Sequence, residues 1–108
     1  MVFDEAAFLD HVSGDKELAR EVLQLFLEDF PRQIEVLREA LARSEAELVR
    51  RQAHTIKGAS GNIGALALQG IALRFEKAAD GEAEGLVKKM EEAFMELRET
   101  LKRLGWWR

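Results

Sequence analysis

Apolar residues recur every three or four positions through most of the chain, which is the spacing of one face of an α-helix. The pattern predicts one short helix followed by four longer ones. They cover residues 3–12, 16 to about 42, about 45 to 61 or 62, 65–79, and about 83–104. The longer helices can cover one another's apolar faces without a sheet. We therefore expect one all-α domain over residues 1–108, an antiparallel up-down four-helix bundle with a short additional N-terminal helix.

The longest predicted helix, residues 16–42, contains Pro31. Proline removes one helical hydrogen bond and crowds the preceding turn, but the apolar spacing continues beyond it. We therefore predict one kinked helix and not two separate ones. The residues expected to face the core from this helix are Leu18, Val22, Leu25, Phe26, Phe30, Ile34, Leu37 and Leu41.

Short polar or glycine-containing segments separate the predicted helices. Ser44 is expected to cap the start of the third helix. Gly64 follows the end of that helix and is a candidate for a left-handed or close-contact position. Residues 80–85 form the clearest loop. At the C-terminus, Trp106 and Trp107 either pack on the end of the bundle or reach a neighbouring molecule, and the pattern leaves both interpretations open.

The third predicted helix has unusually small residues on its interior side, which allow close packing between helices. That side consists of Leu48, Val49, Gln52, Ala53, Ile56, Ala59, Ser60 and Ile63. Thr55 and Ser60 are expected to bond their hydroxyl groups back to the same helix. At about 100° per residue, His54 lies nearly opposite this side. The histidine is therefore expected to face solvent.

The residues that share the exposed side with His54 suggest a docking face. Each exposed helical glycine costs about 1 kcal/mol relative to alanine, a cost with no benefit to the fold unless another surface must come close. The neighbours of His54 on this side, all within about 60° around the helix, are Arg50, Arg51, Lys57, Gly58 and Gly61.

Composition removes several classes of function. The chain is 47% hydrophobic and 33% charged, which is typical of neither a disordered nor a membrane protein. It has no cysteine and only two histidines, His11 and His54, so disulfides, thiolate sites and a histidine metal cluster are not expected. A net charge of −4 disfavours nucleic acid as a ligand. The N-terminus has no signal-peptide pattern, and we expect a cytoplasmic domain without membrane contact.

The chemistry that suits the His54 face is phosphoryl transfer. An exposed imidazole has an ordinary pKa of about 6.5 and offers a neutral nitrogen nucleophile near neutral pH. Lys57, one turn along the helix, can neutralise the oxygens of an incoming phosphoryl group. Gly58 and Gly61 would allow the catalytic groups of a partner to approach closely.

The run Ala53-His54-Thr55-Ile56-Lys57-Gly58-Ala59-Ser60-Gly61-Asn62-Ile63-Gly64-Ala65 resembles the histidine-containing phosphotransfer (HPt) domains of two-component phosphorelays. The match rests on His54-x-x-Lys57-Gly58 followed by Ile63-Gly64, and size and helix order extend it over nearly the whole chain. The resemblance implies a phosphocarrier in which His54 accepts a phosphoryl group from a receiver-domain aspartate and passes it to another receiver. It implies receiver domains and a hybrid sensor kinase as partners.

Glu76 is a candidate supporting residue for His54. A short connection makes the third and fourth helices antiparallel neighbours, so the Glu76 carboxylate can return to the height of His54. The family resemblance implies that such a carboxylate accepts a hydrogen bond from the ring, which would leave Nε2 free to attack. The alternative is an exposed salt bridge of Glu76 with Arg74, Lys77 or a residue of the last helix.

Three interpretations of the exposed histidine remain in competition. A phosphocarrier needs a partner, because the sequence has no nucleotide-binding loop and no carboxylate cluster beside His54 for Mg²⁺. We therefore expect no cofactor bound by this chain and Mg²⁺ in the partner receiver domain. Gly64 is grouped with Arg50, Arg51, Gly58 and Gly61 as a docking residue. The alternatives are a helical interaction module without phosphotransfer and a haem or di-metal bundle, which would need inward-facing ligands that the interior sides lack.

Overall fold

The apolar pattern placed the helices close to where they occur. The structure is a computed structural model that describes residues 1–78 and 81–106, and within these residues every regular element is an α-helix. The helices are α1 (Glu5–His11), α2 (Lys16–Ala42), α3 (Ala46–Asn62), α4 (Leu66–Phe75) and α5 (Ala83–Arg103). The all-α prediction is therefore confirmed. No helix among the described residues is both long enough and apolar enough to cross a membrane.

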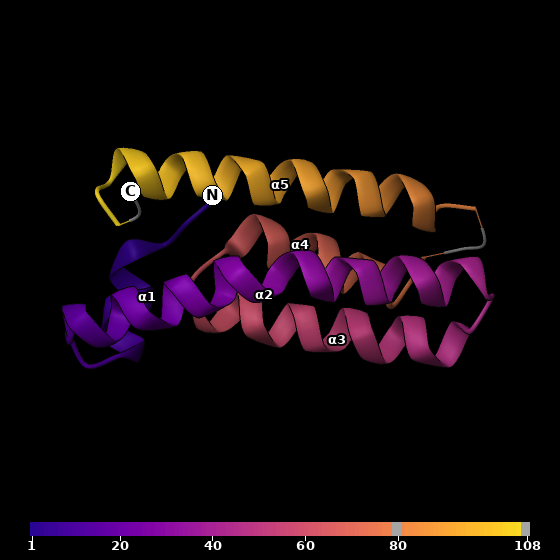
Figure 1. Cartoon of the computed structure of the whole chain (residues 1–108), viewed down its shortest axis with the longest axis horizontal. Helices are drawn as coiled ribbons and strands as arrows, with labels where there is room; N and C mark the ends of the chain where they lie inside the picture. The colour runs from indigo at the N-terminus through magenta and orange to yellow at the C-terminus, as the bar shows by residue number, and fades with distance from the viewer. Residues whose placement is uncertain (79–80, 107–108) are drawn as a thin grey trace.

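The four longer helices form an elongated bundle of about 41 × 22 × 22 Å (Figure 1). α2 packs on α3 and α5, and α4 packs on the same two helices, so α3 and α5 lie at opposite corners. Successive helices run in opposite directions, and α1 crosses one end of the bundle near both chain termini (Figure 1). This is the predicted antiparallel bundle with an extra N-terminal helix.

The core-facing side of α2 differs from the prediction in the first half of the helix. Leu18 and Leu25 were expected in the core, but they are 43% and 66% exposed. The buried residues there are Ala19, Leu23 and Leu27. Both sets repeat at helical spacing, but Leu18 and Leu25 lie about 140–180° around the helix from Leu23 and Leu27, so only one set can face the core. Further along, the predicted residues Phe30, Ile34 and Leu37 are buried.

For Pro31 we predicted one continuous helix and a kink within it, and the structure tests the first of these. The proline lies inside α2, which continues without interruption to Ala42. One helix and not two is therefore confirmed, while the predicted kink stays a prediction.

The turn between α2 and α3 contradicts the predicted cap. Ser44 adopts φ +56°, in the left-handed region, and its N–H donates to the Leu41 carbonyl to close the end of α2. The N-cap of α3 is Glu45, whose side chain forms no capping hydrogen bond. Ser44 thus belongs to the turn that follows α2, since a residue with a left-handed backbone is typical of the end of a helix. By contrast, Asp15 caps α2 by accepting a hydrogen bond from the Leu18 N–H.

The last part of the chain is close to its prediction except at the end of α4. This helix ends at Phe75 and not at residue 79, which lies outside the described residues. α5 begins at Ala83 and ends at Arg103, as expected to within one residue. The predicted loop at 80–85 is described only from residue 81 onward, where Gly81 has φ +96°.

Trp106 packs back on the bundle. Its Nε1 donates to Glu5 Oε2 at 2.6 Å, and its ring meets Phe8 edge-on at 6.2 Å between centroids. The Arg20 guanidinium lies 5.9 Å from the same ring, a favourable distance for a cation–π contact. The first interpretation is therefore correct for Trp106, and Trp107 lies outside the described residues.

Gly64 connects the end of α3 to the N-terminal segment. It has φ +74°, and its carbonyl accepts a hydrogen bond from the Asp4 N–H at 2.8 Å. A Cβ at this position would come within 2.6 Å of the Asp4 carbonyl oxygen. The predicted left-handed or close-contact glycine is therefore both at once, and it fixes how α1 approaches the end of α3.

Candidate functional site

α3 presents His54 to solvent from the middle of the bundle. The inward side of the helix is closed by Val49, Ala53, Ile56 and Ser60, which are all buried. The His54 side chain is 72% exposed, so a partner can reach the ring without any rearrangement of the fold. The small inward residues let α3 pack closely between α2 and α4, and this packing holds the histidine on a rigid support.

Two details of α3 differ between prediction and structure. Thr55 bonds back to the Arg51 carbonyl at 3.1 Å, as expected. The Ser60 hydroxyl was expected to do the same, but it is buried with no hydrogen-bond partner among the residues that the structure describes. Ala59, expected inside, is exposed and lines a hollow between α2 and α3.

Glu76 lies beside His54 at the end of α4, which it caps. Its Oε1 lies 3.2 Å from His54 Nδ1 and 3.0 Å from Lys57 Nζ, so a single carboxylate oxygen serves both side chains. Sequence separations of 22 and 19 residues are bridged here by the antiparallel return of α4. The geometry agrees with the first expectation for Glu76, contact with the ring. The carboxylate also forms a salt bridge, but its partner is Lys57 and not one of the partners predicted for the alternative.

The ion pair keeps Glu76 ionised to a more acidic pH than an unpaired carboxyl. The hydrogen bond from Lys57 lowers the pKa of the Glu76 carboxyl below its ordinary value, and the bond to His54 lowers that pKa further. The group is therefore ionised at neutral pH and can only accept hydrogen bonds. The ring nitrogen that faces it, Nδ1, can bond to this carboxylate only as an N–H donor, and in the neutral ring this leaves the lone pair on Nε2. Lys57 is half-buried and bound to Glu76, not fully exposed as we expected.

The two arginines of the predicted face are exposed at the N-terminal side of His54. The Arg50 guanidinium donates to Glu47 Oε2 at 2.8 Å. This bond lowers the pKa of the Glu47 carboxyl, and the nearby charge of Arg51 adds to the effect. Both side chains remain on the solvent side of α3, where an anionic partner could compete for them.

The three glycines of the predicted docking face have different surroundings. At Gly58 an added Cβ would meet nothing within 4 Å, so the backbone is open there as expected. At Gly61 an added Cβ would lie 2.5 Å from Nε2 of Gln69 on α4. Gly61 therefore makes room for a neighbouring side chain of the same chain, and the expectation of a bare surface at this position is wrong.

Gly64 was also predicted to be a docking residue, but it does not lie on the surface. It is buried beneath the Asp4 backbone, so no partner can contact it directly. The positive φ that suggested a special role is required by the turn and by the N-terminal segment. Its function is structural.

A polar side of α2 that the apolar pattern did not predict lies next to α3. Gln33 donates to Asp29 Oδ2 at 2.8 Å, and Gln52 of α3 donates to the Gln33 carbonyl at 3.0 Å. The Asp29/Gln33 spacing of four residues was a visible signal for a helical pair. Its position beside the histidine helix depended on how α2 and α3 pack. Among the described residues, no three acidic or histidine side chains gather as they would around a metal ion.

Comparisons with known proteins agree with this arrangement. The sequence model of the family described as "Hpt domain" matches residues 21–106. The structure is similar to the crystal structure of histidine-containing phosphotransfer protein B (HptB) from Pseudomonas aeruginosa PAO1, with a TM-score of 0.85 and 26% identity over 94% of this chain and 92% of that one.

A second solved structure supports the fold alone. It is the HPT domain of the Hpt sensor hybrid histidine kinase from Shewanella, with a TM-score of 0.74 and 19% identity over 94% of this chain and 95% of that one. No curated protein matches the chain significantly. Because the family model spans most of the chain, from Glu21 in α2 to Trp106, the protein belongs to the Hpt domain family and is a phosphorelay carrier.

Proposed function

We propose that His54 is the residue that carries the phosphoryl group. The observation that carries this proposal is a ring that is 72% exposed and has its Nδ1 held 3.2 Å from a carboxylate oxygen. The other ring nitrogen, Nε2, is then the nucleophile. His11, the second histidine, is also exposed but lies in the last turn of α1, where no such arrangement surrounds it among the described residues.

The transfer step needs no change in the protonation of His54. The Nε2 lone pair attacks the phosphorus of a receiver's aspartyl phosphate, the N–P bond forms, and the P–O bond breaks with its electron pair leaving on the aspartate carboxylate. Nδ1 keeps its proton, and the Glu76 carboxylate stabilises the positive charge that the ring gains. The reverse step passes the group to a second receiver.

We propose further that the remaining parts of the reaction come from partners. Proteins of this family exchange phosphoryl groups with receiver domains and hybrid kinases. The transferring aspartate and the Mg²⁺ that neutralises phosphoryl charge would belong to the receiver. On this chain, Lys57 screens the phosphoryl oxygens, Arg50 and Arg51 attract the acidic face of the receiver, and Gly58 leaves room for contact.

The proposal is tested by incubating the chain with isolated receiver domains that have been labelled by acetyl phosphate with radioactive phosphorus. The expected product is labelled protein whose phosphate is lost in acid and kept in alkali, as is typical of phosphohistidine. Mass spectrometry of the peptides should place the phosphate on His54. Label that never appears on the chain with any receiver would contradict the proposal.

Glu76→Ala should lower the rate of transfer about tenfold, because a hydrogen bond to a charged group is worth about 1.5–3 kcal/mol and 1.4 kcal/mol corresponds to a factor of ten. Glu76→Gln keeps an acceptor oxygen for Nδ1–H and should stay within about threefold of the native rate. The measurement is single-turnover transfer from a labelled receiver domain. Equal losses in both variants would argue against a positioning role.

Lys57→Ala should slow transfer about three- to tenfold, because one cation beside the phosphoryl oxygens is lost. The same variant tests the ion pair through its pH dependence. The folded-state pKa of Glu76 is lowered, so the stability that the pair contributes is complete above the ordinary carboxyl pKa and is lost as pH falls through the lowered value.

The difference in melting temperature between the native chain and Lys57→Ala should therefore be constant from pH 8 to about pH 5 and shrink below about pH 4. Circular dichroism melting curves across this range make the comparison. A difference that grows on acidification would show that Glu76 is not held ionised by Lys57.

A further inference from the structure

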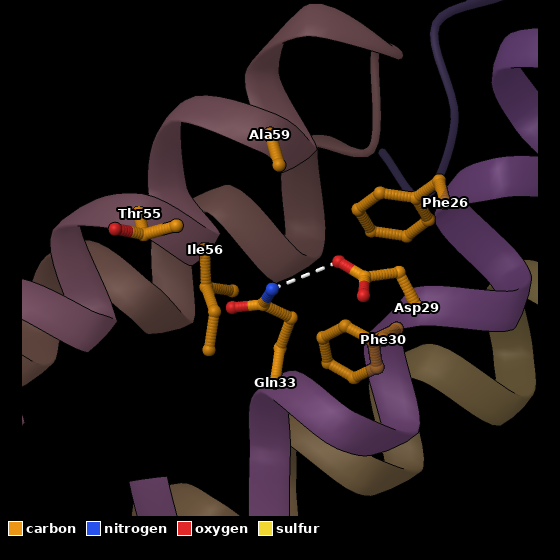
Figure 2. A pocket seen from close by; sticks show the side chains of 7 residues that line it. All are labelled: Phe26, Asp29, Phe30, Gln33, Thr55, Ile56 and Ala59. Carbon is orange, nitrogen blue, oxygen red and sulfur yellow. Dashed lines mark hydrogen bonds between the residues drawn. The ribbon is translucent and has the colours of Figure 1, made fainter. Parts of the chain in front are cut away.

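A small hollow lies between α2 and α3 on the flank of the His54 helix (Figure 2). Its volume is about 110 Å³. Phe26, Phe30 and Ile56 supply an apolar floor, and the rim carries Asp29, Gln33, Thr55 and Ala59. On α3 the lining of the hollow begins at Thr55, about 100° around the helix from His54 on the flank toward α2. A specific protein interface covers about 800 Å² on each partner, so the footprint of a domain docked on His54 is large enough to reach the mouth of this hollow.

The hollow is held open by contacts on both sides. Phe30 stacks on Phe94 of α5 at 4.3 Å between centroids and on Phe26 at 5.6 Å. On the rim, Gln33 donates to Asp29 while Gln52 donates to the Gln33 carbonyl. The bond between Gln33 and Asp29 is drawn in Figure 2. It orients two side chains of the rim before any partner arrives, which lowers the entropy lost on binding.

The size of the hollow indicates what can occupy it. Small-molecule sites usually measure about 300–1,000 Å³, well above the 110 Å³ found here. The space suits one aliphatic side chain. Since the hollow is open to solvent beside a residue that must be visited by another protein, the occupant is a side chain of that protein.

The charges around the hollow indicate which partner face fits. Asp29 lies on the rim with Glu28 beside it in the chain, and both are exposed. On the other side of the hollow, the α3 face that carries His54 is basic, with Arg50 and Arg51. A partner that places an anionic phosphoaspartate over His54 is therefore most complementary if it presents positive charge to Asp29. Opposite charges at the two ends of one footprint fix the orientation of docking.

We propose that the receiver domain docks by inserting one aliphatic side chain into the hollow between α2 and α3, with an adjacent lysine or arginine against Asp29. This contact sets the rotational orientation of the receiver and thus the alignment of its phosphoaspartate with Nε2 of His54. The inference rests on the proposed function and adds to it the chemistry that selects the cognate receiver.

Two variants test the contact independently. Ala59→Leu fills the hollow from its exposed rim without introducing charge, and Asp29→Lys reverses the rim charge. The matched controls are Ala42→Leu at the exposed end of α2 and Glu92→Lys on the exposed side of α5. α5 lies at the corner of the bundle opposite α3, so its outer side is beyond reach of a receiver on His54.

The readout is the receiver concentration that gives half-maximal transfer, measured with the labelled receiver domain that transfers fastest to the native chain. Ala59→Leu should raise this concentration about tenfold, the value of one buried aliphatic side chain. Asp29→Lys should raise it about three- to tenfold at low salt and less at high salt. The controls should stay within about twofold.

A second readout separates docking from chemistry. Phosphoramidate, a small phosphodonor, phosphorylates histidine without protein docking, and both variants should react with it at the native rate. Native half-saturation in Ala59→Leu and Asp29→Lys, with normal transfer, overturns the docking inference and leaves the proposed function intact. Loss of the phosphoramidate reaction would also overturn it, because the variants would then have disturbed the histidine itself. A native chain that accepts no label from any receiver instead removes the proposed function.

Discussion

Replacing His54 by glutamine is expected to lower phosphoryl transfer from a labelled receiver by at least about a thousandfold, to the level of background labelling. Glutamine keeps a polar side chain of similar reach but has no nucleophilic nitrogen. Because the His54 side chain is 72% exposed, the free energy of unfolding should change by no more than about 0.5 kcal/mol. Transfer assays and a melting curve on the same preparation measure both effects.

The matched control for this prediction is His11→Gln, which replaces the second histidine of the chain at an exposed position in α1. It should retain native transfer. Label that persists on His54→Gln, or that disappears from His11→Gln, would show that the phosphoryl group is carried elsewhere. A collapse in the melting temperature of His54→Gln would point to a structural role for the ring.

The largest effect on stability is expected from Gly64→Ala. Alanine in a left-handed conformation costs about 1–2 kcal/mol, and Gly64 has φ +74°. The new Cβ would also lie 2.6 Å from the Asp4 carbonyl oxygen, so the N-terminal segment must move and its hydrogen bond to Gly64 is weakened, at about 1 kcal/mol. A loss of about 2–4 kcal/mol should lower the melting temperature by about 10 °C or more.

Gly58→Ala, in α3, is expected to raise the melting temperature, in contrast to Gly64→Ala. Gly58 lies inside α3, and an added Cβ there meets nothing within 4 Å. Alanine in a helix interior is more favourable than glycine by about 0.5–1 kcal/mol, so this variant should melt a few degrees higher. Similar shifts in the two alanine variants would contradict the distinct roles that the structure gives these glycines.

Gly58 and Gly61 differ in a way that could not be predicted from the sequence. Gly58 and Gly61 share one helix face in the sequence, and both were expected to leave the surface bare. Only Gly58 does so, because the side chain of Gln69 on α4 covers Gly61. Helical periodicity describes directions around one helix, but it does not tell which neighbouring side chain fills the space in that direction.

A different cause explains the error in α2. Leu18 and Leu25 form one apolar series, and Leu23 and Leu27 form another. At about 100° per residue the two series lie about 140–180° apart around the helix, so only one of them can face the core. Spacings of three or four residues joined Leu18 and Leu25 to the predicted core side, although the summed angle puts them on the far side. Packing of α2 against α3 and α5 selects the series that contains Leu23 and Leu27.

Local signals in the sequence determined the number, type and approximate bounds of the helices and the outward direction of His54, because helical hydrogen bonds and side-chain periodicity involve residues three or four positions apart. Tertiary structure decided which distant residues of the chain contact one another. It brought Glu76 to His54 and Lys57, placed Gly64 under Asp4, and formed the hollow between α2 and α3. These contacts join residues that are distant in the chain, and their distances depend on how whole helices pack against one another.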